Sequence, residues 1–426
     1  MEDSRLRYRR FLLLWLGQFV SNFGTALTSF AVGVWVYQQT GSTTSFSFTL
    51  FSSSLPGVLA GPLVGSLIDR YDRRLVLLLS NLGAMAGIGA LTLLFAWREP
   101  GLLVICLLLA VVAVFRTAQW TTFSALIAFL VPQERLGKAN GLVELGRSLS
   151  EIGAPILAGF LLTRIEVSKI LAIDTATYFL AVLILWRLPF RDVVSPGGPR
   201  KKTLAGEVWE GFLYIWQRSG LWTLLILFSS VNFIATVLQV ILTPFVLSMA
   251  TAQELGLVMG IGSSGMVLGG LAISFWGVPQ RKIPWILGLL ALQASTLIVM
   301  GIAPGVVTTT VCLFVFMTLF PIISGMSLVI WQTQTERSYH GRIFAIRRTI
   351  ATATVPVAYL LSGPLGDTFA SRFAPTLWAS AEVPPEARGL GLLFLLFGGL
   401  ALLVVLIAAG RRVLHELETL GPSVES

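Results

Sequence analysis

Long apolar runs constrain this chain more than any other feature of its sequence. Runs of about 20 apolar residues, each long enough to cross the hydrocarbon core of a bilayer, recur from Phe11 to Gly410. With 55% hydrophobic and only 12% charged residues among 426, the composition excludes an ordinary soluble domain. We therefore predict an all-α polytopic membrane protein with twelve transmembrane helices. The expected spans are 11–37, 45–68, 75–96, 101–129, 139–163, 170–188, 221–247, 254–276, 284–302, 306–332, 343–365 and 389–410.

The Lys and Arg residues predict the orientation of these spans. If the N-terminus lies inside, 23 of the 30 Lys and Arg residues, Arg347 and Arg348 among them, fall on the inner side and five on the outer side. Positive residues gather on the cytoplasmic side of membrane proteins, so we expect both termini in the cytoplasm. The net charge of +9 then follows from topology, and we expect no nucleic-acid partner. Because no cleavage site precedes the first span, we expect no removable signal peptide.

Catalytic and metal-binding patterns are missing from the sequence. Both cysteines, Cys106 and Cys312, fall in expected spans, and both histidines, His340 and His415, fall in cytoplasmic segments. We find no Gly-rich phosphate loop with a lysine, no metal-ligand spacing and no histidine within reach of a nucleophile. We therefore predict that the protein is not an enzyme and uses neither a metal nor a cofactor.

The two halves of the chain carry short matching motifs in the same order. Asn22-Phe23 is echoed by Asn232-Phe233, and Arg147 and Arg348 each lie eight residues before a proline. Paired halves place a substrate site near the bilayer midplane between them. We predict six-helix bundles at 1–188 and 221–410, a linker at 189–220 and a cytoplasmic tail at 411–426. Residues 203–218 of the linker have one apolar helical face, which fits either a helix in the inner headgroup layer or a cytoplasmic helix without lipid contact.

The loop after the second span is heavily charged for its length. Three glycines spaced by four residues form a ridge that ends at Gly65 and leads into Asp69-Arg-Tyr-Asp-Arg-Arg74. The stretch resembles the Gly-x-x-x-Asp-Arg-x-Gly-Arg-Arg signature of major facilitator superfamily transporters, with Asp72 in place of Gly. The resemblance implies that Asp69 faces the positive N-terminal end of the eleventh span and closes the cytoplasmic side. The alternative is a positive-inside anchor with no gating role. The predicted cytoplasmic gate is Gly65, Asp69, Arg70, Arg73, Arg74, Glu134, Gly341 and Arg342.

Four ionisable residues fall inside the fourth and fifth expected spans. Glu144, Arg147 and Glu151 share one helical face, and Arg116 lies in the fourth span. Arg116 and Glu151 both lie roughly 20 Å above the inner surface at 1.5 Å per residue, where ionisable groups usually face a cavity. We predict an Arg116–Glu151–Arg147 cluster near the midplane, with Glu144 closer to the cytosol. Burial disfavours a charged carboxylate and arginine favours it, so Glu151 is either a proton-coupling group or half of a permanent salt bridge.

Two further motifs are similar to those of the same superfamily. Arg116-Thr-Ala-Gln119 resembles the Arg-x-x-Gln core of the fourth-helix motif. The resemblance implies that Arg116 is linked to proton transfer. Gly141-x8-Ser150-x3-Ala154-Pro155-x2-Ala158-Gly159 resembles the fifth-helix antiporter motif, with Ser or Ala at several glycine positions. That motif is associated with exporters. Ordinary small-residue packing of a kinked helix is the alternative.

A set of polar residues inside apolar spans predicts a substrate cavity. With several nearby aromatic residues they indicate a large, mostly apolar pocket that suits a bulky amphipathic molecule better than a sugar or an anion. Each is also compatible with helix packing. The predicted cavity residues are Gln18, Asn22, Thr25, Gln119, Asn232, Thr236, Gln239, Trp331 and Gln332.

The whole pattern is similar to the macrolide-efflux and enterobactin-exporter branch of the superfamily. Stretches that carry this likeness include Val131–Gly141 and Gly341–Arg348. The resemblance implies a monomeric, proton-driven exporter of amphipathic drugs or natural products in a bacterial inner membrane, working by alternating access. Alternatives are an exporter of siderophores or lipid-like molecules and a non-transporting membrane sensor on the same fold.

Overall fold

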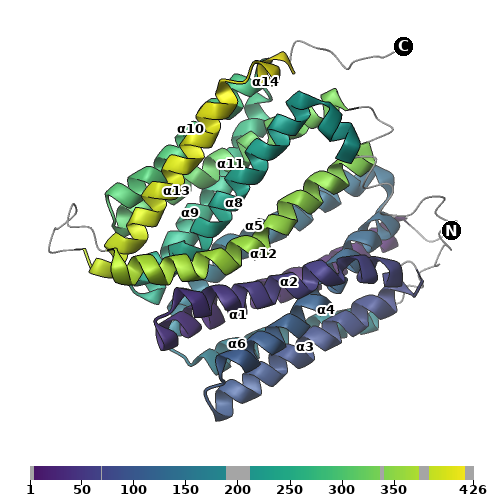
Figure 1. Cartoon of the computed structure of the whole chain (residues 1–426). Helices are drawn as coiled ribbons and strands as arrows, with labels where there is room; N and C mark the ends of the chain where they lie inside the picture. The colour runs from purple at the N-terminus through teal and green to yellow at the C-terminus, as the bar shows by residue number, and fades with distance from the viewer. Residues whose placement is uncertain (1–3, 69, 189–211, 336–339, 374–382, 418–426) are drawn as a thin grey trace. The chain divides into compact units, whose positions relative to one another are not determined.

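The computed structural model describes residues 4–68, 70–188, 212–335, 340–373 and 383–417, and every regular element in these ranges is a helix (Figure 1). Eleven of the described helices have the length and composition needed to cross a membrane. The remaining expected span, 343–365, which is the eleventh in chain order, falls within α12 (His340–Arg372). The predicted all-α polytopic fold is confirmed. Many large apolar side chains, such as Leu63 and Phe275, are exposed, as expected of helices that cross a bilayer.

The chain forms two compact units. The first comprises residues 1–198 and 252–260, and the second comprises 199–251 and 261–426. The predicted linker lies largely outside the described residues, so its bounds and its helix at 203–218 stay predictions. The helices before the linker are α1 (Ser4–Thr40), α2 (Thr43–Ile68), α3 (Arg73–Trp97), α4 (Leu102–Leu130), η1 (Gln133–Arg135), α5 (Leu136–Leu162) and α6 (Val167–Arg187). Those after it are α8 (Ser219–Leu247), α9 (Ala252–Trp276), α10 (Lys282–Ile302), α11 (Val306–Gln334), α12, α13 (Pro385–Ala409) and α14 (Arg412–Glu416).

Small residues set the helix spacing in the first unit. Helix α1 packs against α5 and α6, while α4 packs against α2 and α3. A Cβ on Gly57 of α2 would lie 3.0 Å from the Ala113 carbonyl oxygen of α4, and one on Gly87 of α3 would lie 2.5 Å from Val112. Lipid provides no hydrophobic driving force for helix association, so close packing of the backbones stabilises these helix pairs instead.

The second unit is built in the same way. Helix α8 packs against α12 and α13, and α10 packs against α11 and α13. Gly301 of α10 and Gly391 of α13 allow one such contact, because a Cβ on Gly301 would lie 2.6 Å from the Gly391 carbonyl oxygen. The largest fully buried side chain of this unit, Trp331, lies in a core cluster with residues of α8, α10, α11 and α12.

Candidate functional site

A cavity of about 280 Å³ opens in the first unit between α1, α4 and α5, and we refer to it as the N-cavity. Aromatic side chains of α1 lie over α5 because Gly146 leaves room: a Cβ there would lie 3.1 Å from Phe19. Trp15 is fixed by a hydrogen bond from its Nε1 to the Leu142 carbonyl oxygen at 3.0 Å. The N-cavity is lined by Trp15, Gln18, Phe19, Asn22, Ala26, Arg116, Trp120, Phe123, Val143, Gly146, Arg147, Ser150 and Glu151.

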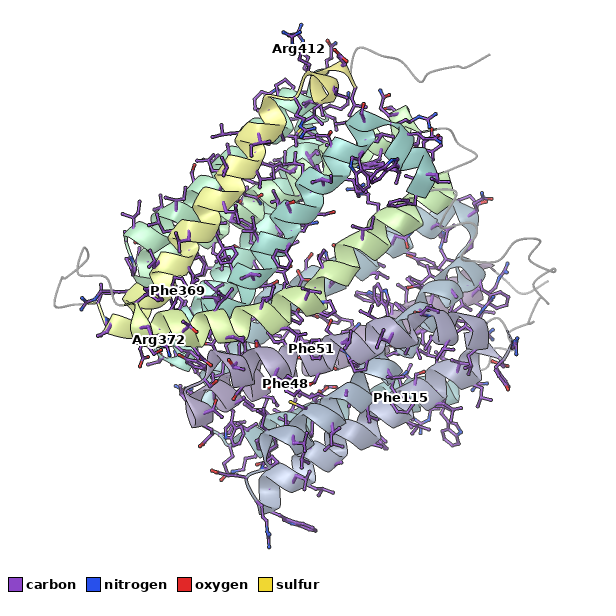
Figure 2. The ribbon with its side chains drawn as sticks, viewed as in Figure 1. Phe48, Phe51, Phe115, Phe369, Arg372 and Arg412 are labelled. Atoms are coloured by element: carbon purple, nitrogen blue, oxygen red, sulfur yellow. The ribbon has the colours of Figure 1, made fainter. Side chains whose placement is uncertain are left out.

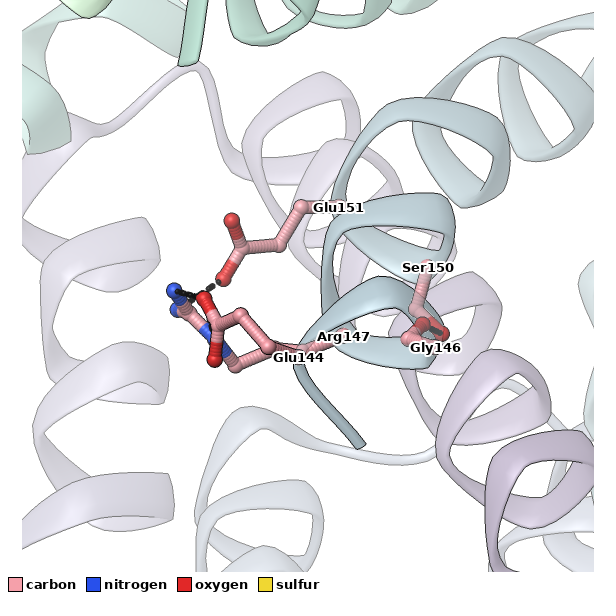
Figure 3. Close-up of polar contacts among 5 residues, drawn as sticks. All are labelled: Glu144, Gly146, Arg147, Ser150 and Glu151. Atoms are coloured by element: carbon pink, nitrogen blue, oxygen red, sulfur yellow. Dashed lines mark hydrogen bonds and ion pairs between the residues drawn. The ribbon is translucent and has the colours of Figure 1, made fainter. Parts of the chain in front are cut away.

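The charged face of α5 carries one arginine held between two carboxylates (Figure 3). Arg147 Nη1 lies 2.7 Å from Glu151 Oε1, and Arg147 Nε lies 3.1 Å from both oxygens of Glu144. Spacings of three and four residues put these side chains on adjacent turns. The three side chains remain 40–61% exposed, so the cluster is open to water and to a small molecule.

Arg116 lines the N-cavity but forms no hydrogen bond or ion pair within the described ranges. Arg116, Arg147 and Glu151 line the same cavity, but Arg116 makes no direct contact with Glu151 among the described residues, and Arg147 contacts Glu144 as well. The physical reason is reach: Glu144 lies one turn before Arg147 on the same helix, and its carboxylate meets the Nε edge of the guanidinium.

Three buried amides tie α1, α3 and α4 together beneath the N-cavity. Gln119 Nε2 donates to Gln18 Oε1 at 2.8 Å and to Asn81 Oδ1 at 3.1 Å, and Asn81 Nδ2 donates to the Leu77 carbonyl oxygen at 2.7 Å. Gln119, which we expected to line the cavity, serves instead as this buried link. Gln18 lines the cavity, and its Nε2 has no partner among the described residues.

A buried acid that no sequence motif predicted, Asp174, lies at the contact of α1 with α6. Asp174 has no exposed surface; Thr25 Oγ1 donates to its Oδ1 at 3.4 Å, and Thr177 Oγ1 donates to the same oxygen at 3.3 Å. Its Oδ2 has no partner within the described ranges. Thr25 Oγ1 also lies 3.0 Å from the Tyr178 hydroxyl, so Thr25 belongs to this group and not to the cavity lining. An acidic residue inside a predicted span was the available signal.

A second cavity, the C-cavity, occupies about 360 Å³ between α8, α10, α11 and α12. It brings together the predicted residues Asn232 and Trp331 with one arginine, Arg347. Thr236 instead donates to the Asn232 carbonyl oxygen at 2.8 Å, while Gln239 and Gln332 are exposed and are not part of this lining. The C-cavity is lined by Leu224, Leu225, Phe228, Ser229, Val231, Asn232, Leu290, Gln293, Phe320, Ile323, Ser324, Trp331 and Arg347.

Arg347, which the sequence places among the residues of the cytoplasmic side, lines the C-cavity with its side chain. Helix α12 begins at His340, about two turns earlier, and its course places Arg347 on the C-cavity. Arg347 Nη2 donates to Ser327 Oγ at 3.3 Å, and its guanidinium carbon lies 5.7 Å from the centroid of the Trp331 ring.

The charged loop before α3 has a local structural role that explains its departure from the signature. Asp72 caps α3: its Oδ1 accepts from the backbone nitrogens of Arg74 at 2.7 Å and Leu75 at 3.3 Å. Arg74 Nη2 donates to the carbonyl oxygens of Leu185 and Trp186 at the end of α6, at 3.3 and 2.9 Å. The backbone carbonyls at a helix C-terminus attract a cation, so Arg74 stabilises the end of α6.

The predicted gate is only partly described. Asp69 and the side chains of Gly341 and Arg342 lie outside the described residues, so the latch stays a prediction. A Cβ on Gly65 would meet no described atom within 4 Å, while Glu134 lies exposed in η1. Of the remaining gate residues, Arg70 lies within the loop and Arg73 begins α3.

The small residues of the antiporter-like motif make close contacts. Ala154 and Ala158 are fully buried in a cluster with Leu27 of α1. A Cβ on Gly159 would lie 2.5 Å from the Ala252 carbonyl oxygen, within the same compact unit, and Pro155 lies inside the helix four residues earlier. These positions therefore act in packing at the end of α5 beyond the charged cluster.

Membrane-spanning helices around cavities with charged walls define a multi-pass membrane transporter. The sequence profile of the Major Facilitator Superfamily matches residues 14–359. The chain belongs to this superfamily.

Curated relatives and solved structures agree with this assignment. The chain is 26% identical to macrolide efflux protein A of Streptococcus pyogenes over 378 residues, covering 87% of this chain and 91% of the relative. It is 25% identical to the multidrug efflux pump Tap of Mycobacterium tuberculosis over 342 residues, covering 78% and 81%. Its fold matches the inward-facing, unoccupied structure of a bacterial homologue of the human lysosomal transporter Spinster, with a TM-score of 0.71, 15% identity and 98% coverage of both chains.

Proposed function

We propose that this protein is a proton-coupled exporter of amphipathic drugs or natural products, and that it works by alternating access between two six-helix bundles. The efflux names of the relatives at 25–26% identity support export. We place it in a bacterial inner membrane as a monomer with both termini in the cytoplasm, in keeping with the distribution of Lys and Arg.

The observation that carries the coupling proposal is the exposed Arg147–Glu151 ion pair in the wall of the N-cavity. Membrane-embedded carboxylates that face a cavity are typical proton carriers. In this proposal, protonation of Glu151 Oε1 breaks its 2.7 Å contact with Arg147, and the freed guanidinium keeps Glu144 as its partner. Substrate binding in the N-cavity and protonation of Glu151 then compete, because both involve the charged side chains of α5 in the cavity wall.

Drug efflux driven by a pH gradient in everted vesicles tests this role. We expect Glu151→Gln to lower gradient-driven uptake at least about tenfold, because an amide cannot exchange the coupled proton. Glu166→Gln is the matched control, since Glu166 precedes α6 and its side chain is 75% exposed beside Lys169. Unchanged uptake by the Glu151→Gln protein would make this pair a permanent structural one.

A second variant separates the two membrane carboxylates. If Asp174→Asn abolishes gradient-driven uptake while Glu151→Gln preserves it, the coupling group is the buried acid between α1 and α6. The proposed gate is tested independently by a spin-label pair across the cytoplasmic side. Asp69→Asn is expected to shift that pair toward the inward-open distance, and an unchanged distance distribution would contradict the latch.

A further inference from the structure

Arg347 is a charged group in a largely apolar cavity without a charged partner. Within the described ranges no carboxylate lies at ion-pair distance from its guanidinium. Its contacts are the hydrogen bond to Ser327 Oγ and the approach to the Trp331 ring. A guanidinium carries five N–H donors, so this hydrogen bond leaves most of them available.

The free-energy cost of holding Arg347 in this cavity without a charged partner favours a ligand that supplies the opposite charge. An arginine at membrane depth is expensive and is normally paired, and the chain shows what pairing looks like at Arg147, which contacts two glutamates. Arg116 also lacks a direct partner, but it shares the N-cavity wall with Glu151. The lining of the N-cavity carries two arginines and one glutamate, and Glu144, which contacts Arg147 beside this lining, supplies a second negative charge. The described wall of the C-cavity carries one positive charge and no negative one.

We propose that the C-cavity binds the anionic group of an amphipathic substrate, with Arg347 as the ion-pair partner. The apolar part of the substrate would lie against Phe228, Leu290 and Phe320, and Asn232 and Ser324 would add hydrogen bonds near the charge. The substrate class is therefore an organic carboxylate, sulfonate or phosphate on an apolar body. This inference rests on the proposed function, because it assumes that the cavities hold the transported molecule, and it departs from our expectation that the pocket suits an anion poorly.

The geometry of the wall supports a planar, bidentate anion. Gln293 is held in place because its Nε2 donates to the Phe316 carbonyl oxygen at 2.9 Å. Trp331 is 1% exposed and cannot move easily, so the guanidinium beside it has a fixed support. An arginine fixed by an aromatic ring and a hydroxyl is oriented for fork-like recognition of a carboxylate.

Equilibrium binding to the full-length protein in nonionic maltoside micelles tests the proposal. The probes are 1-naphthoate and its neutral analogue 1-naphthamide, which share a ring system and differ in charge. By titration calorimetry we expect the wild type to prefer naphthoate about tenfold, the ratio that one hydrogen bond to a charged group supplies. Arg347→Gln should reduce this ratio to about one without weakening naphthamide, and Arg347→Lys should keep part of it.

The control variant lies on the same helix. Arg372, in the last turn of α12 (Figure 2), is exposed and far along the chain from the cavity. We expect Arg372→Gln to keep the full preference. Equal preference in wild type and Arg347→Gln, or no naphthoate binding by a wild type that melts cooperatively, would overturn the proposal. A melting scan of each variant excludes unfolding, and Arg347→Lys provides the second reading if the Gln variant does not fold.

A phospholipid headgroup presents the same anionic chemistry, so a further arm distinguishes it. Short-chain phosphatidylglycerol is titrated in place of naphthoate; if only this lipid binds in an Arg347-dependent manner, the site is a lipid site and the substrate proposal fails. The assay uses no ion gradient, so its outcome is independent of proton coupling. If Glu151→Gln keeps the naphthoate preference while losing gradient-driven uptake, both proposals stand separately.

Discussion

The two cavities differ most clearly in the partners of Arg147 and Arg347. In the N-cavity, Arg147 contacts Glu144 and Glu151 on its own helix. In the C-cavity, Arg347 contacts only a hydroxyl and an aromatic ring among the described residues. Each cavity thus holds an arginine from a helix with an internal proline, Pro155 in α5 and Pro356 in α12, but the partners of the two arginines differ. The difference fits the two proposals, in which the Arg147 cluster exchanges a proton through Glu151 and Arg347 binds an anionic group.

The largest effect should come from removing the centre of the Arg147 cluster. Arg147→Met leaves Glu144 and Glu151 facing each other without a cation, and we expect transport to fall about fiftyfold. Breaking a fully buried pair costs about 3–5 kcal/mol, and partial exposure of these side chains reduces that figure. Vesicle uptake measures the loss.

The double variant Arg147→Met with Glu151→Gln sharpens the comparison, because it removes one charge of each sign. We expect it to restore folding yield and downhill substrate flux, while uptake that depends on the pH gradient stays lost. A double variant no better than Arg147→Met alone would show that the guanidinium acts through something other than these carboxylates.

A packing change near Asp174 should have the next largest effect. A Cβ on Gly24 would lie 2.4 Å from Thr177 Oγ1 and 3.2 Å from Asp174 Cα, so Gly24→Ala must move α1 away from α6. We expect the free energy of unfolding, measured by thermal melting in detergent, to fall by about 2 kcal/mol, within the range for overpacked sites. Gly89→Ala is the control, since its Cβ would lie 3.7 Å from Thr175, an ordinary contact. Equal melting of both variants would contradict this account of Gly24.

Giving Arg347 a carboxylate partner should make the C-cavity resemble the N-cavity. Ser327 is fully buried and its hydroxyl lies 3.3 Å from Arg347 Nη2. We expect Ser327→Asp to remove the roughly tenfold naphthoate preference, because the new carboxylate occupies the guanidinium. Naphthamide binding should remain. Ser327→Ala, which removes the hydrogen bond without adding charge, should keep the preference, and its loss there would argue against an ion pair with the ligand.

The smallest effect should follow from Glu144→Gln. The carboxylate is 61% exposed, and exposed ion pairs contribute about 0–1 kcal/mol, so we expect the unfolding free energy to change by less than about 1 kcal/mol. Gradient-driven uptake should persist, because Arg147 keeps Glu151. If Glu144→Gln abolishes coupling as fully as Glu151→Gln, the two glutamates act as one unit and the assignment to Glu151 alone is wrong.

Local patterns predicted the helices well because membrane spans are dictated by length and apolar content. The expected span 170–188, for example, appears as α6 from Val167 to Arg187. The same patterns placed Glu144, Arg147 and Glu151 on one face, since helical spacing alone decides that. They failed for Thr25 and Gln119, which turned out to bond Tyr178 and Gln18 across helices. A polar residue in a span faces either a cavity or another helix, and spacing cannot tell which.

The sequence by itself determined a helical membrane protein, the superfamily resemblance and the charged face of α5, because each depends on residues close together in the chain. Only the tertiary structure decided that Asp174 is fully buried against α1, that Arg116 is not paired with Glu151, and that Arg347 lines a cavity beside Trp331. These outcomes depend on which helices pack together and how closely. Small residues such as Gly24 and Gly146 set that spacing, and their effect appears only when the helices are assembled.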